Sequence, residues 1–260
     1  MLAVTVLDAA CEVGANLSLD LVEIGYVAAD GTEQRVSPAD APRVVFESCA
    51  PVRRFLWRKG QRHLSGRWWS ATMAGHVGHE SWLERDHLML LDYDPGVVGI
   101  ASQPFWLFWT TAEGKARSHA PDYFARRVNG CGVVIDCRPE DRIKARDVVA
   151  FAATARVCEL LGWDYRLVGA PDAVTVGNVR WLSGYRHPRH DRPVLAAVLG
   201  EVFAAPGPLL AGAETVGDPI AVLPVLFHLL WRHELVVDLT VPLGPSSAVT
   251  ANAAISAAAP

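Results

Sequence analysis

The alternation of apolar and polar positions divides the first hundred residues into strand-like and helix-like stretches. Residues 1–50 hold the strand-like pieces LAVTVL, LDLVEIGYVA and RVVFESC, with ADGTEQ as a turn between the last two. Apolar positions then recur at helical spacing in GHESWLERDHLMLLDYDPGV, and Asp94-Pro95-Gly96 ends that pattern. The first part of the chain therefore predicts a β-rich region followed by an amphipathic helix.

The middle of the chain predicts a mixed sheet flanked by helices. VVGIASQPFWLFWTT has the composition of one or two strands broken at Pro104, and AEGKARS that of a hairpin-like turn. APDYFARRV and GVVIDCR are predicted strands joined by the tight turn NGC. RDVVAFAATARVCELLGW is an amphipathic helix, and DYRLVGA is a further strand. Helix, three strands, helix and strand in this order favour an α/β fold.

The pattern changes again from about residue 192. PVLAAVLGEVFAA and DPIAVLPVLFHLLWRHEL predict two helices, VVDLTVPL predicts a strand, and the small, polar tail SSAVTANAAISAAAP is expected to be disordered. We therefore expect four parts: an N-terminal β-rich region with a basic Trp/Arg arm (1–70), an α/β core (71–185), a helical module with a hairpin (192–248) and a disordered tail (249–260).

Composition narrows the classes of protein to consider. The 260 residues suffice for one large domain or two small ones. The net charge is −4, whereas a non-specific nucleic-acid binder is usually basic, so contact with DNA would need a local patch or a partner. Five cysteines without a CxxC favour a reducing cytosol over a disulfide framework or zinc ribbon. The absence of a basic leader and of an apolar run long enough to span a bilayer predicts a soluble cytoplasmic protein.

The most basic stretch, PVRRFLWRKGQRHLSGRWW (51–69), interleaves arginines with tryptophans. Two interpretations remain open. It is either a solvated loop whose tryptophans pack under the core, or an arm whose arginines contact DNA phosphates while the aromatic rings contact sugar or base. The second interpretation makes Arg53, Arg54, Arg58 and Lys59 candidate substrate-binding residues.

Three acids stand where a predicted helix and two predicted strands begin or end. Glu84 is in the helix, Asp122 starts one strand and Asp136 ends the next, so a short turn should place the two aspartates side by side. Paired carboxylates repel unless a cation joins them, and oxygen ligands suit Mg²⁺ or Mn²⁺, which can activate water against a phosphodiester. Arg138 shares a strand face with Asp136 and could neutralise the phosphate. Each acid taken alone could equally be a surface residue or a salt-bridge partner.

The complete pattern resembles a known class of nuclease. The chain has an acid on the upstream helix, then the dipeptide PD, and about a dozen residues later an apolar strand that ends in acid-x-cation. This order resembles the PD-(D/E)xK signature of restriction-endonuclease-like nucleases. Five short motifs within residues 78–185 are similar to those of TnsA-type endonuclease subunits of heteromeric transposases. They are S-W-L-E-R-D, D-Y-D-P, S-Q-P, H-A-P-D-Y and V-V-I-D-C-R-P. The resemblance implies a restriction-endonuclease-like mixed sheet, with a winged-helix-like module at 192–248.

The resemblance also implies roles for single residues. Glu84, Asp122 and Asp136 would be catalytic metal ligands, and the backbone carbonyl of Cys137 would be a further ligand. Gln103 would line the substrate site or have a structural role, and Arg138 occupies the position of the usual lysine. Arginine stays protonated and cannot act as a base, although it can hold a phosphate. The implied cofactor is Mg²⁺, with Mn²⁺ expected to substitute.

Together these features predict a metal-dependent DNA endonuclease. It would cleave a phosphodiester in double-stranded DNA at transposon ends, together with an integrase-type transposase subunit and an AAA+ ATPase regulator. The alternative is a non-catalytic DNA- or protein-binding subunit on a nuclease fold, in which Arg138 marks the loss of activity. A solitary nuclease of defence or repair is a third possibility.

Overall fold

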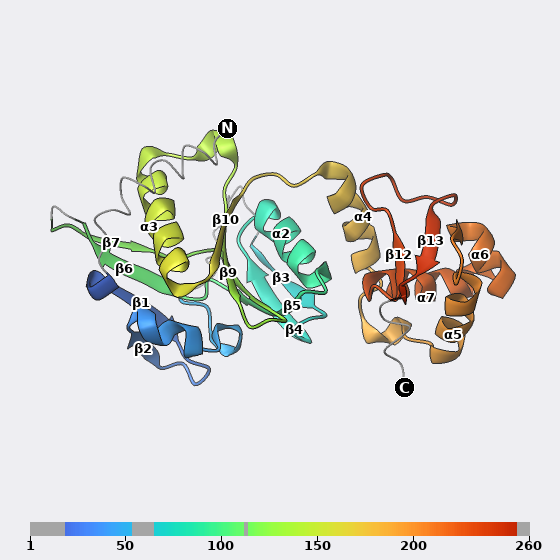
Figure 1. The fold of residues 1–260 in the computed structure, drawn as a ribbon, viewed down its shortest axis with the longest axis horizontal. Coiled ribbons are helices and arrows are strands. Elements are labelled where there is room, and N and C mark those ends of the chain that lie inside the picture. The colour runs from blue at the N-terminus through green and yellow to red at the C-terminus, as the bar shows by residue number, and fades with distance from the viewer. Residues whose placement is uncertain (1–18, 54–64, 112–113, 254–260) are drawn as a thin grey trace. The chain divides into compact units, whose positions relative to one another are not determined.

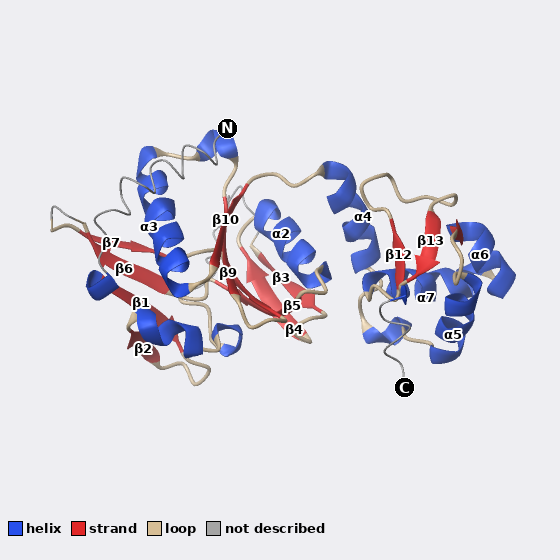
Figure 2. Ribbon diagram, viewed as in Figure 1, coloured by secondary structure: helices blue, strands red, loops and turns tan. Residues whose placement is uncertain are grey.

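The computed structural model describes residues 19–53, 65–111 and 114–253, and it divides into two compact units (Figure 1). The first unit comprises the chain up to Asp92 together with Gly96–Ala170, and the second comprises Tyr93–Pro95 and the chain from Pro171 onward. Helices accompany several sheets, most of whose strands pair antiparallel, so the predicted α/β class is confirmed (Figure 2). The division after Ala170 precedes the position near residue 192 at which we expected the C-terminal module to begin.

One sheet of the first unit joins the N-terminal strands to strands from the predicted core. Its four strands pair antiparallel in the order β2-β1-β6-β7, and Ile24 lies opposite Leu107. The N-terminal region is therefore part of the same unit as the core. The strands are β1 (Val22–Val27), β2 (Glu33–Val36), β6 (Trp106–Thr110) and β7 (Ala116–His119).

The stretch RVVFESC, which we expected to be strand-like, contributes to 3₁₀ helices at Pro38–Arg43 and Phe46–Ser48 instead. The burial of Phe46 accounts for this difference. The ring of Phe46 is fully buried and lies 5.0–6.0 Å from the rings of Tyr26, Phe105, Phe124 and Trp163. The packing of this ring against four others holds the segment in the core, and tertiary packing of this kind overrides the local strand pattern.

A second sheet carries the aspartates and is covered on both faces. Its order is β10-β9-β8-β5, in which β9 runs parallel to β10 and the other pairs are antiparallel. All residues of β9 are buried, because α3 packs on the side of Phe124 and Val134 and α2 on the side of Tyr123 and Ile135 (Figure 1). Coverage of both faces explains the continuous apolar run GVVI. The elements are β5 (Val97–Ser102), β8 (Tyr123–Arg127), β9 (Gly132–Cys137), β10 (Asp164–Val168), α2 (Trp82–Tyr93) and α3 (Ala145–Leu161).

A two-stranded hairpin, β3 (Gly66–Ser70) with β4 (Gly75–His79), is tied to the end of α2 by the buried carboxylate of Asp92. Asp92 accepts hydrogen bonds from the indole N–H of Trp68 (2.9 Å) and the hydroxyl of Ser70 (2.6 Å). It also accepts the backbone N–H groups of Ala71 (3.1 Å) and Thr72 (2.9 Å). Four donors on one carboxylate satisfy a buried charge and position the helix that carries Glu84.

The second unit combines helices with a small sheet of order β11-β13-β12. Two expectations are corrected here. The helix Ala173–Ser183, capped by Asp172 through the N–H of Thr175 (2.8 Å), was not predicted. Residues 248–251, assigned to a disordered tail, form a strand whose Val249 is fully buried. The elements are α4 (Ala173–Ser183), α5 (Pro193–Val202), β11 (Gly207–Pro208), α6 (Leu209–Val216), α7 (Pro219–Trp231), β12 (Leu235–Val237) and β13 (Ala248–Ala251).

The longest apolar run lies in α7. Among the residues that the structure describes, no helix combines the length and the apolar character needed to cross a membrane.

Candidate functional site

Asp122 and Asp136 lie opposite each other at one end of the β8–β9 pair. Tyr123 pairs with Ile135, and the N–H of Asp122 donates to the carbonyl of Ile135 (3.1 Å), which places the two aspartates across from one another. The Asp122 carboxylate accepts the backbone N–H of Cys137 (2.7 Å). The tight turn NGC between the strands therefore brings together two acids that are fourteen residues apart.

Glu84 approaches the same region from the start of α2. It is the third residue of the helix, and its carboxylate accepts the hydroxyl of Ser81 (2.8 Å) and the N–H of Glu80 (2.7 Å). The Glu84 N–H donates back to the Ser81 hydroxyl oxygen (3.1 Å). This is the geometry of a helix cap, and S-W-L-E has the S-x-x-E pattern that predicts one. Glu84 thus has a structural role in addition to any role in a site.

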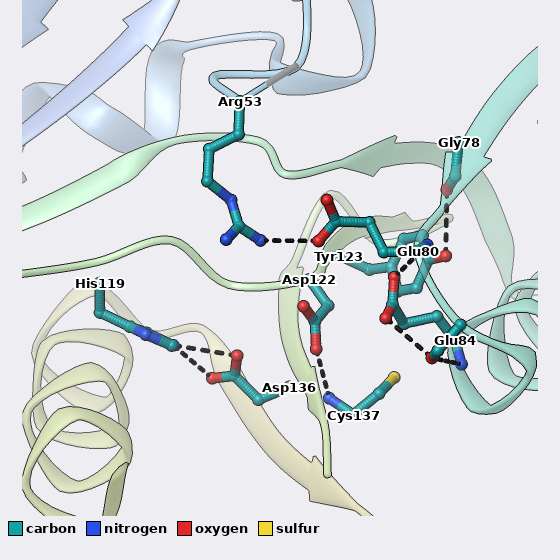
Figure 3. A network of polar contacts seen from close by, with 10 residues as sticks. Arg53, Gly78, Glu80, Glu84, His119, Asp122, Tyr123, Asp136 and Cys137 are labelled. Carbon is teal, nitrogen blue, oxygen red and sulfur yellow. Dashed lines mark hydrogen bonds and ion pairs between the residues drawn. The ribbon is translucent and has the colours of Figure 1, made fainter. Parts of the chain in front are cut away.

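The charges of the three acids converge on Asp122, which lies between Asp136 on one side and Glu80 and Glu84 on the other (Figure 3). Burial raises the pKa of Asp122 well above its usual value, and the charges of Asp136 and Glu84 raise it further. The N–H of Cys137 and the charge of Arg138 oppose that rise. Burial likewise raises the pKa of Glu84, while its hydrogen bonds and Arg53 oppose the rise. Among the described residues, the charges of Arg138 and Arg53 thus offset only part of the repulsion among these acids.

Asp136 is held by two side chains from other strands. Both of its carboxylate oxygens lie near Nε2 of His119 (2.9 and 3.0 Å), and the hydroxyl of Tyr165 donates to one of them (2.8 Å). The Asp136 side chain is only 3% exposed, so these contacts replace solvent. The ring of His119 packs edge-on against Phe151 of α3, with centroids 5.6 Å apart. Asp136 consequently faces the α3 side of the sheet.

Arg138 lies on that same side. Its guanidinium carbon is 6.0 Å from the centre of the Phe151 ring, and its backbone N–H donates to the carbonyl of Val168 (2.9 Å). Its Nε is buried and has no hydrogen-bond partner in the described part of the chain. The guanidinium is close enough to Asp122 to influence the ionisation of that acid.

Gln103 lies beside Asp122 in an unusual conformation. Its N–H donates to the carbonyl of Asp122 (2.8 Å), and its own carbonyl accepts the N–H of Val52 (2.9 Å). Its φ of 45° is rare for a residue with a side chain. Both polar atoms of its buried amide lack a partner within the residues described. A strained backbone and an unsatisfied amide at one position are typical of a functional site.

The basic arm is only partly visible. Arg53 forms an ion pair with Glu80 (3.2 Å) at the edge of the acid cluster. Arg54, Arg58 and Lys59 lie outside the described residues.

A divalent cation fits this cluster in donor chemistry, because carboxylate oxygens and excess negative charge suit Mg²⁺ or Mn²⁺. Within the described ranges, however, no group of three or more His, Cys, Asp or Glu side chains is arranged to hold a metal ion. Asp136 raises the pKa of Asp122 more than Glu84 does, but its carboxylate is already engaged by His119 and Tyr165, whereas Asp122 and Glu84 accept hydrogen bonds only from neighbouring backbone and Ser81 donors in the described residues. Mg²⁺ commonly binds one or two carboxylates and keeps several waters, so two acids satisfy its needs.

Sequence reasoning missed the partners that orient the acids. His119 was readable in H-A-P-D-Y, but it lies at the end of β7, which pairs with β6 in the first sheet, and only the folded structure places its Nε2 at Asp136 of the second sheet. Tyr165 comes from β10, and its position follows from the parallel pairing of β10 with β9.

Comparison with known proteins adds no relative. No protein-family model matches the chain, and no curated protein matches it significantly. The resemblance to TnsA-type endonucleases therefore rests on the quoted motifs.

Proposed function

We propose that the chain is a divalent-metal-dependent DNA endonuclease, acting as the TnsA-like subunit of a heteromeric transposase that cleaves phosphodiester bonds at transposon ends. The observation that carries the proposal is the buried carboxyl of Asp122, whose pKa is raised by burial and by Asp136 and Glu84. Like charges are gathered at a buried point only at a cost, which a bound cation would offset. Gln103, beside Asp122, has a strained backbone and a side-chain amide without a partner in the described part of the chain, which adds a second sign of a functional site.

Asp122 and Glu84 would hold Mg²⁺ or Mn²⁺, with the carbonyl of Cys137 and Asp136 nearby. The metal would supply Lewis-acid stabilisation of the phosphate and a lowered pKa for bound water. Arg138 would hold a non-bridging phosphate oxygen through its unpaired Nε, which places a fixed positive charge where negative charge develops. His119 and Tyr165 would keep Asp136 in a single orientation beside this site.

The two units support the finer architecture that we propose. The first would be a restriction-endonuclease-like domain with a mixed, doubly covered sheet. In the second, the order α5, β11, α6, α7, β12, β13 and the pairing of β13 between β11 and β12 support a winged-helix-like module. Because α7 carries little positive charge, this module would contact an integrase-type transposase subunit or an AAA+ ATPase regulator. The described cysteines are all free thiols, in keeping with a cytoplasmic location.

A non-catalytic DNA- or protein-binding subunit is the second candidate, and a specific observation favours it. The carboxylates of Glu84 and Asp136 already accept hydrogen bonds from protein donors, as a structural network would. Arginine at position 138 also removes the lysine of the related nucleases.

A strand-resolved nicking assay on a transposon-end duplex, with the partner subunits present, decides between the two. The wild type should nick in Mg²⁺ and in Mn²⁺, and Asp122→Asn should not. The matched control is Asp164→Asn, which removes an exposed carboxylate from β10 of the same unit and should cut normally. Absence of cleavage by the wild type in the complete complex favours the binding subunit.

A further inference from the structure

A pocket of about 410 Å³ lies where the chain leaves β9 and enters α3. Its lining holds four cationic side chains and two carboxylates. The cations are Arg138, Arg142, Lys144 and Arg146, and the carboxylates are Asp141 and Asp147. The surplus of positive charge contrasts with the net charge of −4 for the whole chain. An overall acidic protein that binds a polyanion needs such a local concentration of cations.

Asp147 is engaged by the start of α3 more than by the pocket. Its carboxylate accepts the backbone N–H of Lys144 (3.2 Å) and lies 3.5 Å from Nε of Arg146. The Asp147 side chain is 19% exposed, whereas that of Arg146 is 80% exposed. The carboxylate thus serves the helix end, and the cations extend to solvent where an external anion can reach them.

Arg138 connects this pocket to the acid cluster. It lines the pocket, and it follows Cys137, whose N–H binds Asp122. Its buried Nε lacks a hydrogen-bond partner within the described residues. A buried donor without a partner is costly, and an oxygen of the phosphate at the acid cluster would satisfy it, which leaves Arg142, Lys144 and Arg146 for the neighbouring phosphate. A guanidinium fork binds the oxygens of a phosphate with two parallel hydrogen bonds. Phosphates recur at regular intervals along a DNA strand, so one strand could supply an oxygen to several cations of this pocket.

We propose that this cationic pocket binds a backbone phosphate of duplex DNA, adjacent to the phosphate that faces the acid cluster. The DNA strand would run from the acid cluster past Arg138 to Arg142, Lys144 and Arg146. The volume accommodates a phosphate with its sugar. The proposal rests on the proposed action on DNA but requires no cleavage, so it holds for the enzyme and for the DNA-binding alternative.

The test is duplex binding by fluorescence anisotropy in EDTA, over a range of salt concentrations, with the full chain. The triple variant Arg142→Gln/Lys144→Gln/Arg146→Gln should bind about tenfold more weakly. The slope of log affinity against log salt should fall by about 0.9 for each phosphate that the variant no longer neutralises. Replacement of chloride by inorganic phosphate at equal ionic strength should weaken binding by the wild type but not by the triple variant.

The matched control is Arg35→Gln/Arg43→Gln/Arg156→Gln, which removes the same charge from the same unit. Each of these arginines pairs with its own acid: Glu23, Asp40 and Glu159 respectively. The control should bind like the wild type. Three results would overturn the proposal. They are equally weakened binding in the two triple variants, unchanged binding in the pocket variant, and no duplex binding by the wild type. Lys144→Glu alone provides a second variant with the same expected direction, and thermal unfolding checks that each variant folds.

Discussion

Asp122→Asn should make the first unit more stable at neutral pH while abolishing cleavage. Asparagine is nearly isosteric, and its side-chain oxygen can still accept the N–H of Cys137, which lies 2.7 Å from the present carboxylate. It cannot ionise, so it removes the charge that burial, Asp136 and Glu84 all disfavour. A residue that lowers the free energy of unfolding of the native protein is typical of a functional position.

The magnitude follows from the raised pKa of Asp122. Each unit by which folding raises a pKa costs about 1.4 kcal/mol once the pH exceeds both values. For a unit of this size, that corresponds to a melting temperature about 3–6 °C higher in the variant for each unit. Because the folded pKa lies above the ordinary 3.8, the cost is absent below 3.8 and grows as the pH rises toward the folded value. The advantage of the variant should therefore vanish near pH 4.

The assay is calorimetric unfolding in EDTA at neutral pH and near pH 4, with Asp164→Asn as the control for removal of an exposed charge. Saturating Mn²⁺ should then stabilise the wild type and leave Asp122→Asn unchanged, because a ligand that binds only the native state stabilises it. A variant no more stable than the wild type at neutral pH would refute the claim that the Asp122 charge destabilises the fold. An advantage that persists undiminished near pH 4 would also refute it, because repulsion would not be its source.

Three further changes have defined outcomes. Asp92→Ala removes the acceptor of four hydrogen bonds and should lower the free energy of unfolding of the first unit by at least about 3 kcal/mol in urea denaturation, whereas an effect below about 1 kcal/mol would contradict the network. Gly212→Ala would bring a Cβ into steric overlap with Cζ of Phe203 and should destabilise the second unit by about 1–3 kcal/mol, measured by thermal unfolding, while Gly177→Ala meets no atom within 4 Å and should not. Arg138→Ala should slow nicking by roughly a hundredfold or more, and Arg138→Lys should keep or raise it, so equal rates for wild type and Arg138→Ala would exclude a role on the phosphate.

The elements that the sequence predicts well are those with a clear period or a continuous apolar run. The helix around Glu84, the strands on either side of NGC, and the following helix and strand are all confirmed. The strand at Ala248–Ala251 was missed because AVTA is short and small, and its burial depends on pairing with β12 and β11. The helix Ala173–Ser183 was missed because AVTVGNV is rich in β-branched residues, and the packing of Val179 and Leu182 in the folded unit overrides that preference.

The candidate site, like the fold, could be predicted only in part from the sequence. The adjacency of Asp122 and Asp136 could be predicted, since a tight turn between two strands sets the register that places them opposite each other. The contacts of His119 and Tyr165 with Asp136 could not, because they depend on how β7 and β10 lie against β9. The capping role of Glu84 was readable from S-x-x-E and was overlooked in favour of the catalytic interpretation.

The most direct test of the central claim is the position of Mn²⁺ in crystals of the protein soaked at saturating metal, located by its anomalous scattering. The proposed metal site predicts a peak about 2.1 Å from carboxylate oxygens of Asp122 and Glu84, and its absence in Asp122→Asn. A metal found elsewhere, or no peak at Asp122 in a crystal that holds Mn²⁺ at other sites, would contradict it.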